Sequence, residues 1–566
     1  MRSGGQVLID TLIRNNVDTI FGVPGESYLN ALNAIAERSN AMRYITCRQE
    51  GGAAFMAEAY GSLRDVPGVC FVTRGPGVTN ASIGVHTAFQ GSTPMLLLIG
   101  QIPRGQMERE AFQEIDYRNM LAPMTKWVAQ IEDAARIPEM VTRALRTAVS
   151  GRPGPVALAL PEDMLAEQTD AEDIPPFARS TPTPSRDEMI DLRTHLRNTE
   201  RPLMVLGGTG WSEKGRADIT AFAEQNALPV ATAFRRQSLF TNDHDCYIGN
   251  LGFAGIPVPN SYAEDADLII AVGTRLGSGT TLHYKLINAP KATQKIVHVH
   301  PGAEELGRVI HADLPIQADV NAFAYKAAAM GKCRQEGSNG QRVRSKIRQK
   351  YEKSLQLGPQ KGPIDMGEIM AWLRSELPRD TIVTNGAGNF ADWPNRFYSY
   401  RGSNTIVAPV SGAMGHGVPG AIAAKLAYPE RTVVCFAGDG DFLMNGQELA
   451  TAMRYGTGVV FLVINNSMYG TIRMNQENAF PGKVSGTELT NPDFAAYARS
   501  FGAAGVQVHE TEEFFPAFEQ AYNASQSTVI ELLVGPDHLG PELNLSDINA
   551  ENGNNGEEKV HQDEQN

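Results

Sequence analysis

The chain has 566 residues, far more than a single hydrophobic core serves, so we expect three or four domains. Its apolar share of 42% and charged share of 20% are typical of an ordinary soluble globular protein. The formal net charge of −13 excludes a general nucleic-acid binder, which needs a basic face. A locally basic pocket can still bind an anionic substrate although the net charge of the whole chain is negative.

Cysteine usage and the lengths of the apolar runs indicate the compartment. The five cysteines are widely spaced and form no C-x-x-C pair, which predicts a reducing environment and no zinc site. The apolar runs are shorter than the ~20 residues that cross a bilayer. Asp10 interrupts the apolar stretch near the N-terminus, so no signal peptide is expected. We therefore predict a cytoplasmic protein that binds neither nucleic acid nor membrane.

Strand-like and helix-like stretches alternate through the first domain, which we place at 1–167. The strand-like runs are 44–47, 69–73, 95–99 and 156–160. Such alternation predicts a parallel sheet covered by helices. The proline-rich stretch 167–186 follows, and we interpret it as an extended linker.

Two further α/β segments follow the linker, a central domain at 187–330 and a C-terminal domain at 362–546. The strands expected in the central domain are 203–206, 268–272 and 296–299. Between the two domains lies a basic stretch, 332–361, which we interpret as a solvated helix rather than a phosphate site. Residues 547–566 are rich in Asn, Glu and Gln and predict a disordered tail. The predicted fold class is α/β, with three doubly wound parallel-sheet domains.

The strongest chemical signal is Gly438-Asp439-Gly440, followed after 24 intervening residues by Asn465-Asn466. Each motif comes after a strand-like run, so the acid and the amide are expected at the carboxyl ends of neighbouring strands, where open α/β sheets bind ligands. Carboxylate and amide oxygens suit Mg²⁺, and the glycines let the backbone approach a diphosphate. A tight turn without a ligand is the alternative, and the full spacing disfavours it.

A second signal is Glu50, within the sequence R-Q-E-G-G-A-A-F-M-A at 48–57. This glutamate follows a strand-like run, stands among small apolar residues, and is predicted to open a helix. Taken alone, it could merely complement the helix dipole. Beside the magnesium motif, a role in proton transfer is the better hypothesis.

Both motifs, in this order along nearly the whole chain, resemble thiamine-diphosphate-dependent enzymes of the acetolactate synthase type. The resemblance implies that the first domain binds the pyrimidine ring of the cofactor and that the third domain binds its diphosphate, with the central domain between them in the sequence. It also implies that Asp439 and Asn466 bind Mg²⁺ through their side chains, and Met468 through its backbone carbonyl. Glu50 would hydrogen-bond the aminopyrimidine ring and promote loss of the thiazolium C2 proton.

The resemblance extends the site to further turns of the first and third domains. The implied cofactor contacts, besides Glu50, Asp439, Asn466 and Met468, are Pro24, Gly25, Gly388, Asn389, Gly412, Met414, Gly438, Gly440, Asp441, Tyr469 and Gly470. Met414 would wedge beneath the cofactor and bend it. The residues implied on the substrate side are Gly25, His86, Phe112, Gln113, Ile472 and Asn475. His86 and His416 could move protons, although a structural histidine is the more common case for each.

Several positions depart from the family pattern. The usual G-Q-H at the diphosphate is Gly388-Asn389-Phe390, and a phenyl ring cannot donate a hydrogen bond. The aspartate pair of biosynthetic acetolactate synthases is replaced by Gly277 and Ser278, so we predict no stoichiometric FAD. Their substrate-side tryptophan aligns with Asn475, which leaves the specific acetolactate reaction open.

The leading functional hypothesis is a decarboxylating carboligase that acts on a 2-oxo acid. The closest alternative is a non-oxidative 2-oxo acid decarboxylase, or a C–C lyase of the benzaldehyde-lyase kind. A cofactor-binding regulatory protein without turnover would not need Glu50. A nicotinamide dehydrogenase fails because Gly207-Gly208-Thr209-Gly210 is not a full dinucleotide fingerprint. By the resemblance, the partner is a small 2-oxo acid or aldehyde, and the assembly is a homodimer or homotetramer with the cofactor between subunits.

Overall fold

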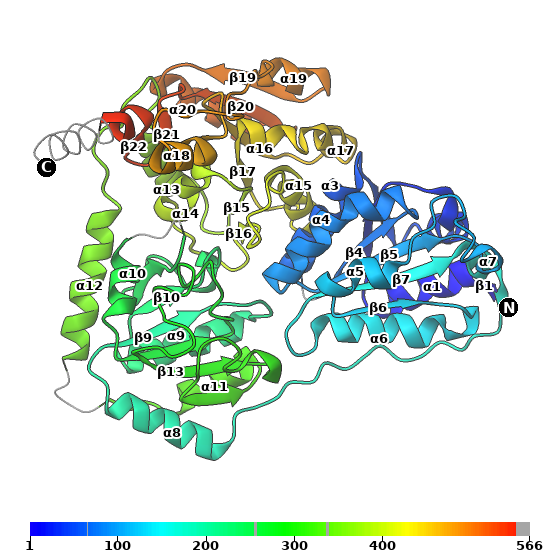
Figure 1. Cartoon of the computed structure of the whole chain (residues 1–566), viewed down its shortest axis with the longest axis horizontal. Helices are drawn as coiled ribbons and strands as arrows, with labels where there is room; N and C mark the ends of the chain where they lie inside the picture. Colours follow the sequence, from blue (N-terminus) through cyan, green and yellow to red (C-terminus); the bar gives the residue numbers. More distant parts are fainter. Residues whose placement is uncertain (65, 254–256, 335–338, 551–566) are drawn as a thin grey trace, which may run out of the picture. The chain divides into compact units, whose positions relative to one another are not determined.

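The structure is a computed structural model that describes residues 1–64, 66–253, 257–334 and 339–550. It contains three six-stranded parallel sheets flanked by helices, which confirms the predicted fold class (Figure 1). The chain divides into two compact units. The N-terminal unit consists of Met1–Tyr351 with Pro409–Ala413, and the C-terminal unit consists of Glu352–Ala408 with the residues from Met414 onward.

The first sheet has the strand order β3-β2-β4-β5-β7-β6. Its strands are β2 (Thr19–Gly22), β3 (Arg43–Thr46), β4 (Gly68–Val72), β5 (Met95–Gln101), β6 (Trp127–Gln130) and β7 (Pro155–Pro161). The central strands β4, β5 and β7 are buried along their whole length, which explains why they read as continuous apolar runs.

Helices enclose this sheet and share its core. Apolar side chains of α1 (Gly4–Arg14), α2 (Leu29–Glu37) and α6 (Ile137–Val149) pack with those of the strands in one cluster. The helices α3 (Glu50–Leu63) and α4 (Pro76–Gly91) pack against each other and against β4. Because α3 and α4 follow β3 and β4 directly, their first residues lie at the carboxyl edge of the sheet.

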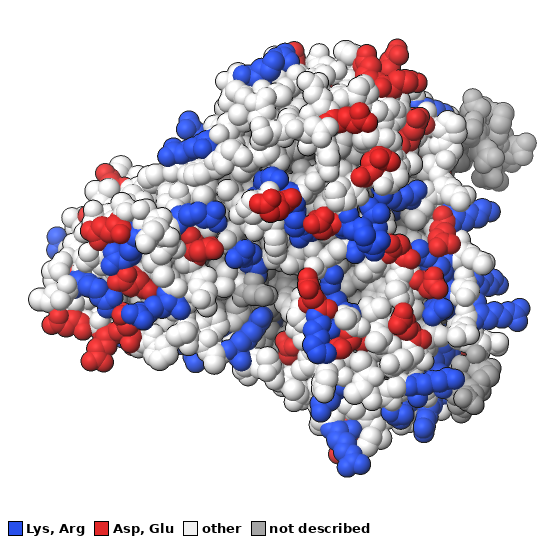
Figure 2. Space-filling view, turned by 180° about the vertical axis from the view of Figure 1, so that it is seen from behind, with Lys and Arg blue, Asp and Glu red and all other residues white. Residues whose placement is uncertain are grey.

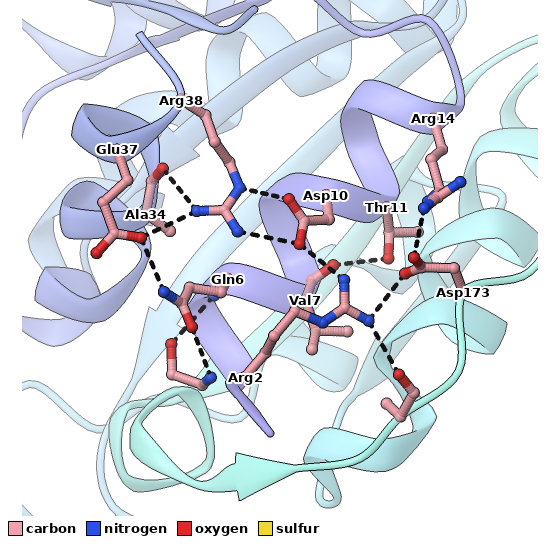
Figure 3. Close-up of polar contacts among 12 residues, drawn as sticks. Arg2, Gln6, Val7, Asp10, Thr11, Arg14, Ala34, Glu37, Arg38 and Asp173 are labelled. Carbon is pink, nitrogen blue, oxygen red and sulfur yellow. Dashed lines mark hydrogen bonds and ion pairs between the residues drawn. The ribbon is translucent and has the colours of Figure 1, made fainter.

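A polar network fastens α1 to its surroundings (Figure 3). Asp10 accepts hydrogen bonds from both Arg2, at 2.7 Å, and Arg38 of the turn after α2. Asp173, in the segment after the first domain, binds Arg2 at 2.9 Å and also Arg14. Burial opposes the charge of Asp10, but the hydrogen bonds from Arg38 and Arg2 outweigh burial and lower its pKa.

The central sheet has the order β11-β10-β9-β12-β13-β14. Its strands are β9 (Pro202–Leu206), β10 (Val230–Thr232), β11 (Tyr247–Asn250), β12 (Leu268–Val272), β13 (Lys295–His300) and β14 (Leu314–Gln317). Its flanking helices include α9 (Glu213–Gln225), α10 (Pro257–Glu264) and α11 (Val320–Ala329). The basic stretch after this sheet forms α12 (Gly340–Ser354), of which only three residues are buried.

The third sheet has the order β16-β15-β17-β18-β20-β19. Its strands are β15 (Ile382–Asn385), β16 (Ile406–Val407), β17 (Val433–Gly438), β18 (Val460–Asn465), β19 (Ala504–Val508) and β20 (Thr528–Leu533). The helices that matter for the site are α15 (Gly417–Ala427), α16 (Asp439–Leu443), α18 (Gly470–Ala479) and α19 (Phe494–Ser500). In chain order the six strands are arranged as in the first sheet, with the first strand between the second and the third.

The predicted disordered tail falls mainly on 551–566, which lie outside the described residues. Residues 545–550 are helical, and buried Ile548 packs with Leu539 and Met468 in a small apolar cluster. Helical structure is therefore found beyond position 547, the predicted start of the tail, and Ile548 covers the loop that carries Met468.

The described residues include no helix with both the length and the apolar character needed to cross a bilayer. On the face drawn in Figure 2, the described basic and acidic side chains are interspersed.

Candidate active site

Two glycine turns meet at the carboxyl edge of the first sheet. β2 and β4 are neighbours in the sheet. The chain continues from β2 to β3 in one direction along the strand order and from β4 to β5 in the other, which makes the gap between β2 and β4 a topological switch point. The turn after β2 carries Pro24 and Gly25, and the turn after β4 carries Thr73 and Gly75. A Cβ on Gly25 would lie 2.5 Å from the Cβ of Thr73, so only glycine lets the two turns approach so closely.

Glu50 opens α3 beside these turns, as predicted from the sequence. Gln49 caps the helix, because its side chain accepts a hydrogen bond from the amide of Gly52 at 3.1 Å. The half-buried carboxylate of Glu50 accepts a hydrogen bond at Oε2 from Nδ2 of Asn80 on α4, at 3.0 Å. The other oxygen, Oε1, lies 3.6 Å from where a Cβ on Gly77 would be. The carboxylate is therefore held against the N-terminal end of α4.

The structure brings only some of the predicted substrate-side residues together. Gln113 packs on the Gly75 turn, since a Cβ on Gly75 would lie 2.9 Å from that of Gln113. Phe112 beside it is 75% exposed. His86 lies farther along α4 and is exposed. In the C-terminal unit, α18 carries the other two residues, Ile472 and Asn475, and both are exposed.

The third sheet gathers the diphosphate and metal candidates at its own carboxyl edge. Gly388 follows β15, Asp439 follows β17 and Asn466 follows β18, and these three strands are adjacent. Phe390 packs across two of the turns: a Cβ on Gly438 would lie 2.7 Å from its ring, and one on Gly388 would lie 2.9 Å away. The phenyl ring that departs from the family pattern therefore shapes the turns.

Asp439 is the charged member of the candidate metal site and is only 3% exposed. Burial raises its pKa, against a hydrogen bond from Nδ2 of Asn491 to Oδ2 at 2.7 Å. A carboxylate that is costly to ionise in this environment is stabilised by a cation. The donor chemistry of the position therefore fits a bound metal ion.

The neighbouring loop supplies neutral oxygen donors. Oδ1 of Asn466 accepts from the amide of Met468 at 3.2 Å, and its Nδ2 donates to the carbonyl of His538 at 2.8 Å. Ser467, between Asn466 and Met468, has a φ of 57°. Within the described residues there is no cluster of three His, Cys, Asp or Glu side chains that could hold a metal. One carboxylate with amide and carbonyl oxygens suits Mg²⁺, which completes its shell with phosphate oxygens and water.

Asn389 and Asp441 have different roles in the cofactor turns. The amide and Oδ1 of Asn389 both bind Oγ1 of Thr471, at 3.1 and 2.8 Å, which fixes the side chain and leaves Nδ2 with a 3.8 Å contact to the sulfur of Met474. Oδ1 of buried Asp441 accepts from the amides of Ala387 and Gly415, at 3.1 and 2.9 Å. Asp441 therefore fastens the turn after β15 to the turn that carries Met414.

Met414 and His416 lie between β16 and α15. Met414 is half-buried and stands between Gly412 and Gly415, which both have positive φ angles. His416 is completely buried at the start of α15. Tyr469 packs on Gly440, where a Cβ would lie 2.5 Å from the tyrosine ring.

Three family models match the chain in sequence order. They are the N-terminal thiamine pyrophosphate binding domain at 2–120, the central domain at 190–326, and the C-terminal thiamine pyrophosphate binding domain at 386–532, all of thiamine pyrophosphate enzymes. The chain belongs to the thiamine pyrophosphate enzymes.

Curated relatives of this thiamine pyrophosphate enzyme include acetolactate synthase large subunits. The one from Parasynechococcus marenigrum is 32% identical over 94% of this chain and 87% of its own length. That of Lactococcus lactis is 31% identical over 89% of this chain and 88% of its own. A putative thiamine pyrophosphate-containing protein of Bacillus subtilis, YdaP, is 26% identical over 94% and 92%.

A cavity of 190 Å³ lies at the carboxyl ends of β9 and β12 of the central domain in this thiamine pyrophosphate enzyme, and Gln90, Gly91 and Ser92 of the first domain also line it. Arg236 lines it and donates to the carbonyl of Gly91 at 2.8 Å. Arg275, also in the lining, is paired with buried Glu305 at 3.3 Å. Gly277 and Ser278, which replace the aspartate pair, line the same cavity. The absence of stoichiometric FAD stays a prediction.

Sequence reasoning missed the asparagines that hold the two key carboxylates. Asn80 ends the sequence T-R-G-P-G-V-T-N at 73–80, which contains the Gly75 turn, so its proximity to the site could have been expected, but not its bond to Glu50. Asn491 is 52 positions from Asp439. The only local signal at Asn491 is the following Pro492, which restricts the backbone before it to extended conformations.

Proposed function

We propose that this thiamine pyrophosphate enzyme is a decarboxylating carboligase that acts on a 2-oxo acid, with thiamine diphosphate anchored by Mg²⁺. The observation that carries the proposal is the buried Asp439, set beside Asn466 at the carboxyl edge of the third sheet. The relatives named as acetolactate synthases, matched over nearly their full lengths, support the reaction class.

In this proposal Asp439, Asn466 and the carbonyl of Met468 would hold Mg²⁺, and Mg²⁺ would anchor the diphosphate. The turns at Gly388-Asn389, Gly438–Asp441 and Tyr469-Gly470 supply the close backbone approach and the amide donors that a diphosphate requires. Asp441 contributes by fixing two of these turns, because its carboxylate accepts from their backbone amides.

When bound, thiamine diphosphate supplies a nucleophilic carbon that adds to a carbonyl and accepts the electron pair released by decarboxylation. This chemistry needs a proton to move on and off the pyrimidine ring, and Glu50 would hold and transfer that proton. Its half-buried position suits proton exchange, and the bond from Asn80 keeps the carboxylate in one orientation. Pro24, Gly25 and Gly412 would shape the space around the ring, and Met414 would support it from below.

On the substrate side we propose Gly25, His86, Phe112, Gln113, Ile472 and Asn475. Of these, Gln113 is fixed against the Gly75 turn near Glu50, so it is the best candidate for contact with the substrate carbonyl.

The functional unit would be a homodimer or homotetramer. Glu50 and Asp439 lie on separate thiamine-binding domains. In a dimer, the carboxyl edge of the first sheet of one chain would face the carboxyl edge of the third sheet of the other chain. All five cysteines are free and buried, which fits the proposed cytoplasmic location.

Product analysis tests this function. With pyruvate alone, and then with pyruvate and an added aldehyde, a carboligase releases CO₂ and forms a new hydroxyketone. Free aldehyde and CO₂ as the only products would identify a decarboxylase, and cleavage of an added hydroxyketone without release of CO₂ would identify a lyase. Asn475 is exposed and stands at the position of the family's substrate-side tryptophan. This difference is the reason to test for decarboxylase and lyase activity as well.

A further inference from the structure

The segment before α19 runs alongside the loop that carries the proposed metal ligands. Met468 and Glu488 form an antiparallel bridge. The amide of Leu489 donates to the carbonyl of Ser467 at 2.9 Å, and the amide of Tyr469 donates to that of Thr487 at the same distance. This backbone pairing brings Asn491, two residues farther on, to the edge of the third sheet.

Asn491 uses both hydrogens of its amide group at this position. One is donated to Oδ2 of Asp439 at 2.7 Å, and the other to Oδ1 of Asn465 at 3.0 Å. The following Pro492 restricts the backbone of Asn491 to extended conformations. A single amide therefore spans the ends of β17 and β18.

The bridge continues into the sheet through buried groups. Nδ2 of Asn465 donates to Oε1 of Glu531, a β20 residue that is 1% exposed, at 2.8 Å. The other oxygen of Glu531 accepts from the amide of Phe494 and from Nε2 of Gln507, at 3.1 and 2.9 Å. Asn491 is thus connected to a carboxylate that is fixed from three directions.

The same bridge also constrains the loop with the neutral donors. Oδ1 of Asn465 accepts from the amide of Ser467 at 3.0 Å, besides the bond from Asn491. Ser467 has a positive φ angle and separates Asn466 from Met468. The bond to Asp439 and the bond to Asn465 therefore set the distance between the carboxylate after β17 and the oxygen donors after β18.

We infer that Asn491 is a positioning residue for the divalent cation: its bond to Oδ2 holds the carboxylate of Asp439 in one orientation, and it keeps the two ligand-bearing loops in register. The inference rests on the proposed function, since it assumes that Asp439 binds the metal. Groups that orient a metal ligand without touching the metal typically change metal affinity by ~10–100-fold when removed.

The test measures Mn²⁺ binding to the full-length protein in the presence of saturating thiamine diphosphate, from the electron paramagnetic resonance signal of free Mn²⁺. Asn491→Leu keeps the size of the side chain and removes both hydrogen bonds. We expect its dissociation constant for Mn²⁺ to rise about 10–100-fold, with cofactor binding recovered at excess Mn²⁺. Asn491→Ala gives the same measurement with a smaller side chain, should the leucine variant fail to fold.

Two further variants separate the possible failures. Asn33→Ala removes an asparagine-to-carboxylate bond of 2.8 Å on α2, far from the proposed ligands in sequence, and should bind Mn²⁺ as the wild type does. Wild-type Mn²⁺ affinity in Asn491→Leu or Asn491→Ala, together with lost affinity in Asp439→Ala, would overturn the role of Asn491 alone. Wild-type affinity in Asp439→Ala would overturn the proposed metal site itself.

Discussion

The first and third sheets have the same strand arrangement but place different chemistry on equivalent strands. In each, the first strand lies between the second and the third. The second strand leads to Glu50 in the first sheet and to the Gly412–Met414 segment in the third. The third strand leads to the glycine turn at Gly75 in one and to Gly438-Asp439-Gly440 in the other. One architecture therefore presents the proposed proton carrier in one domain and the proposed cation ligand in the other.

The two carboxylates differ mainly in burial and in the way they are held. Glu50 is half-buried and bonded by Asn80, itself an exposed residue. Asp439 is 3% exposed and held by half-buried Asn491, whose amide also bonds buried Asn465. A partly exposed carboxylate can exchange a proton, whereas a deeply buried one needs a cation or several hydrogen bonds to stay charged. Burial, rather than residue type, thus assigns the two roles that we propose.

Glu50→Gln is expected to have the largest effect on proton transfer. The variant keeps the size of the side chain but cannot accept a proton as a carboxylate does. We expect it to fold and bind thiamine diphosphate, and to exchange the C2 proton on the order of 10²–10⁴-fold more slowly. Hydrogen–deuterium exchange followed by NMR after acid quench measures this rate, and an unchanged rate would remove Glu50 from the proposed chemistry.

Asp439→Ala tests the other side of the comparison. It should weaken Mg²⁺-dependent binding of thiamine diphosphate by roughly 10²-fold to 4 × 10³-fold, because loss of a buried charged partner costs ~3–5 kcal/mol. Isothermal titration calorimetry at fixed Mg²⁺ measures the affinity. Asp191→Ala, at an exposed position of α8 (Arg186–Arg197), is the control. Undiminished affinity in Asp439→Ala would contradict the assignment of the metal site.

Asn80→Ala sharpens the contrast between the two carboxylates. Removing the 3.0 Å bond to Oε2 should leave the cofactor affinity nearly unchanged and slow C2 exchange about tenfold, the equivalent of ~1.4 kcal/mol. The readout is the same exchange experiment, with Asn33→Ala as the matched control. If exchange is as fast as in the wild type, Asn80 does not orient Glu50.

Asp10→Asn tests a carboxylate that serves only the fold. Hydrogen bonds from Arg38 and Arg2 outweigh burial and lower the pKa of Asp10 in the folded protein. Its stabilisation is therefore fully present above the unfolded-state pKa of ~3.9 and disappears as the pH falls through the lower folded pKa. We expect a loss of about 1 kcal/mol at pH 7 that shrinks toward pH 3. Urea unfolding across this range checks the sign, and a difference that grows toward acid would contradict it.

The sequence predicted elements whose pattern is continuous and local. β5, β7, β12 and β18 are buried along their full length and appear as apolar runs. The strands that escaped prediction include β10, with three residues, and β14, whose alternating burial gives a weaker signal. Short and half-buried strands depend on their neighbours in the sheet, which local patterns do not encode.

In the candidate site too, local sequence patterns predicted the placement of residues but not the contacts between distant ones. Asp439 and Asn466 follow buried strands, so their placement at one edge could be predicted from the parallel topology. The bond between Asn491 and Asp439, and the bonds of Asp441 to the amides of Ala387 and Gly415, join residues from separate turns. Phe390 could be recognised as a departure from the family pattern, but its packing on Gly388 and Gly438 required the structure.

The central claim is that Glu50 and Asp439 serve one site, completed by two copies of the chain. Mixing Glu50→Gln chains with Asp439→Ala chains, each inactive alone, tests it most directly. After verified subunit exchange, every heterodimer would contain one site with both residues intact, so we predict that carboligase activity returns in the mixture and in neither parent. A mixture that stays inactive after exchange, or a fully active wild-type monomer, would contradict the account.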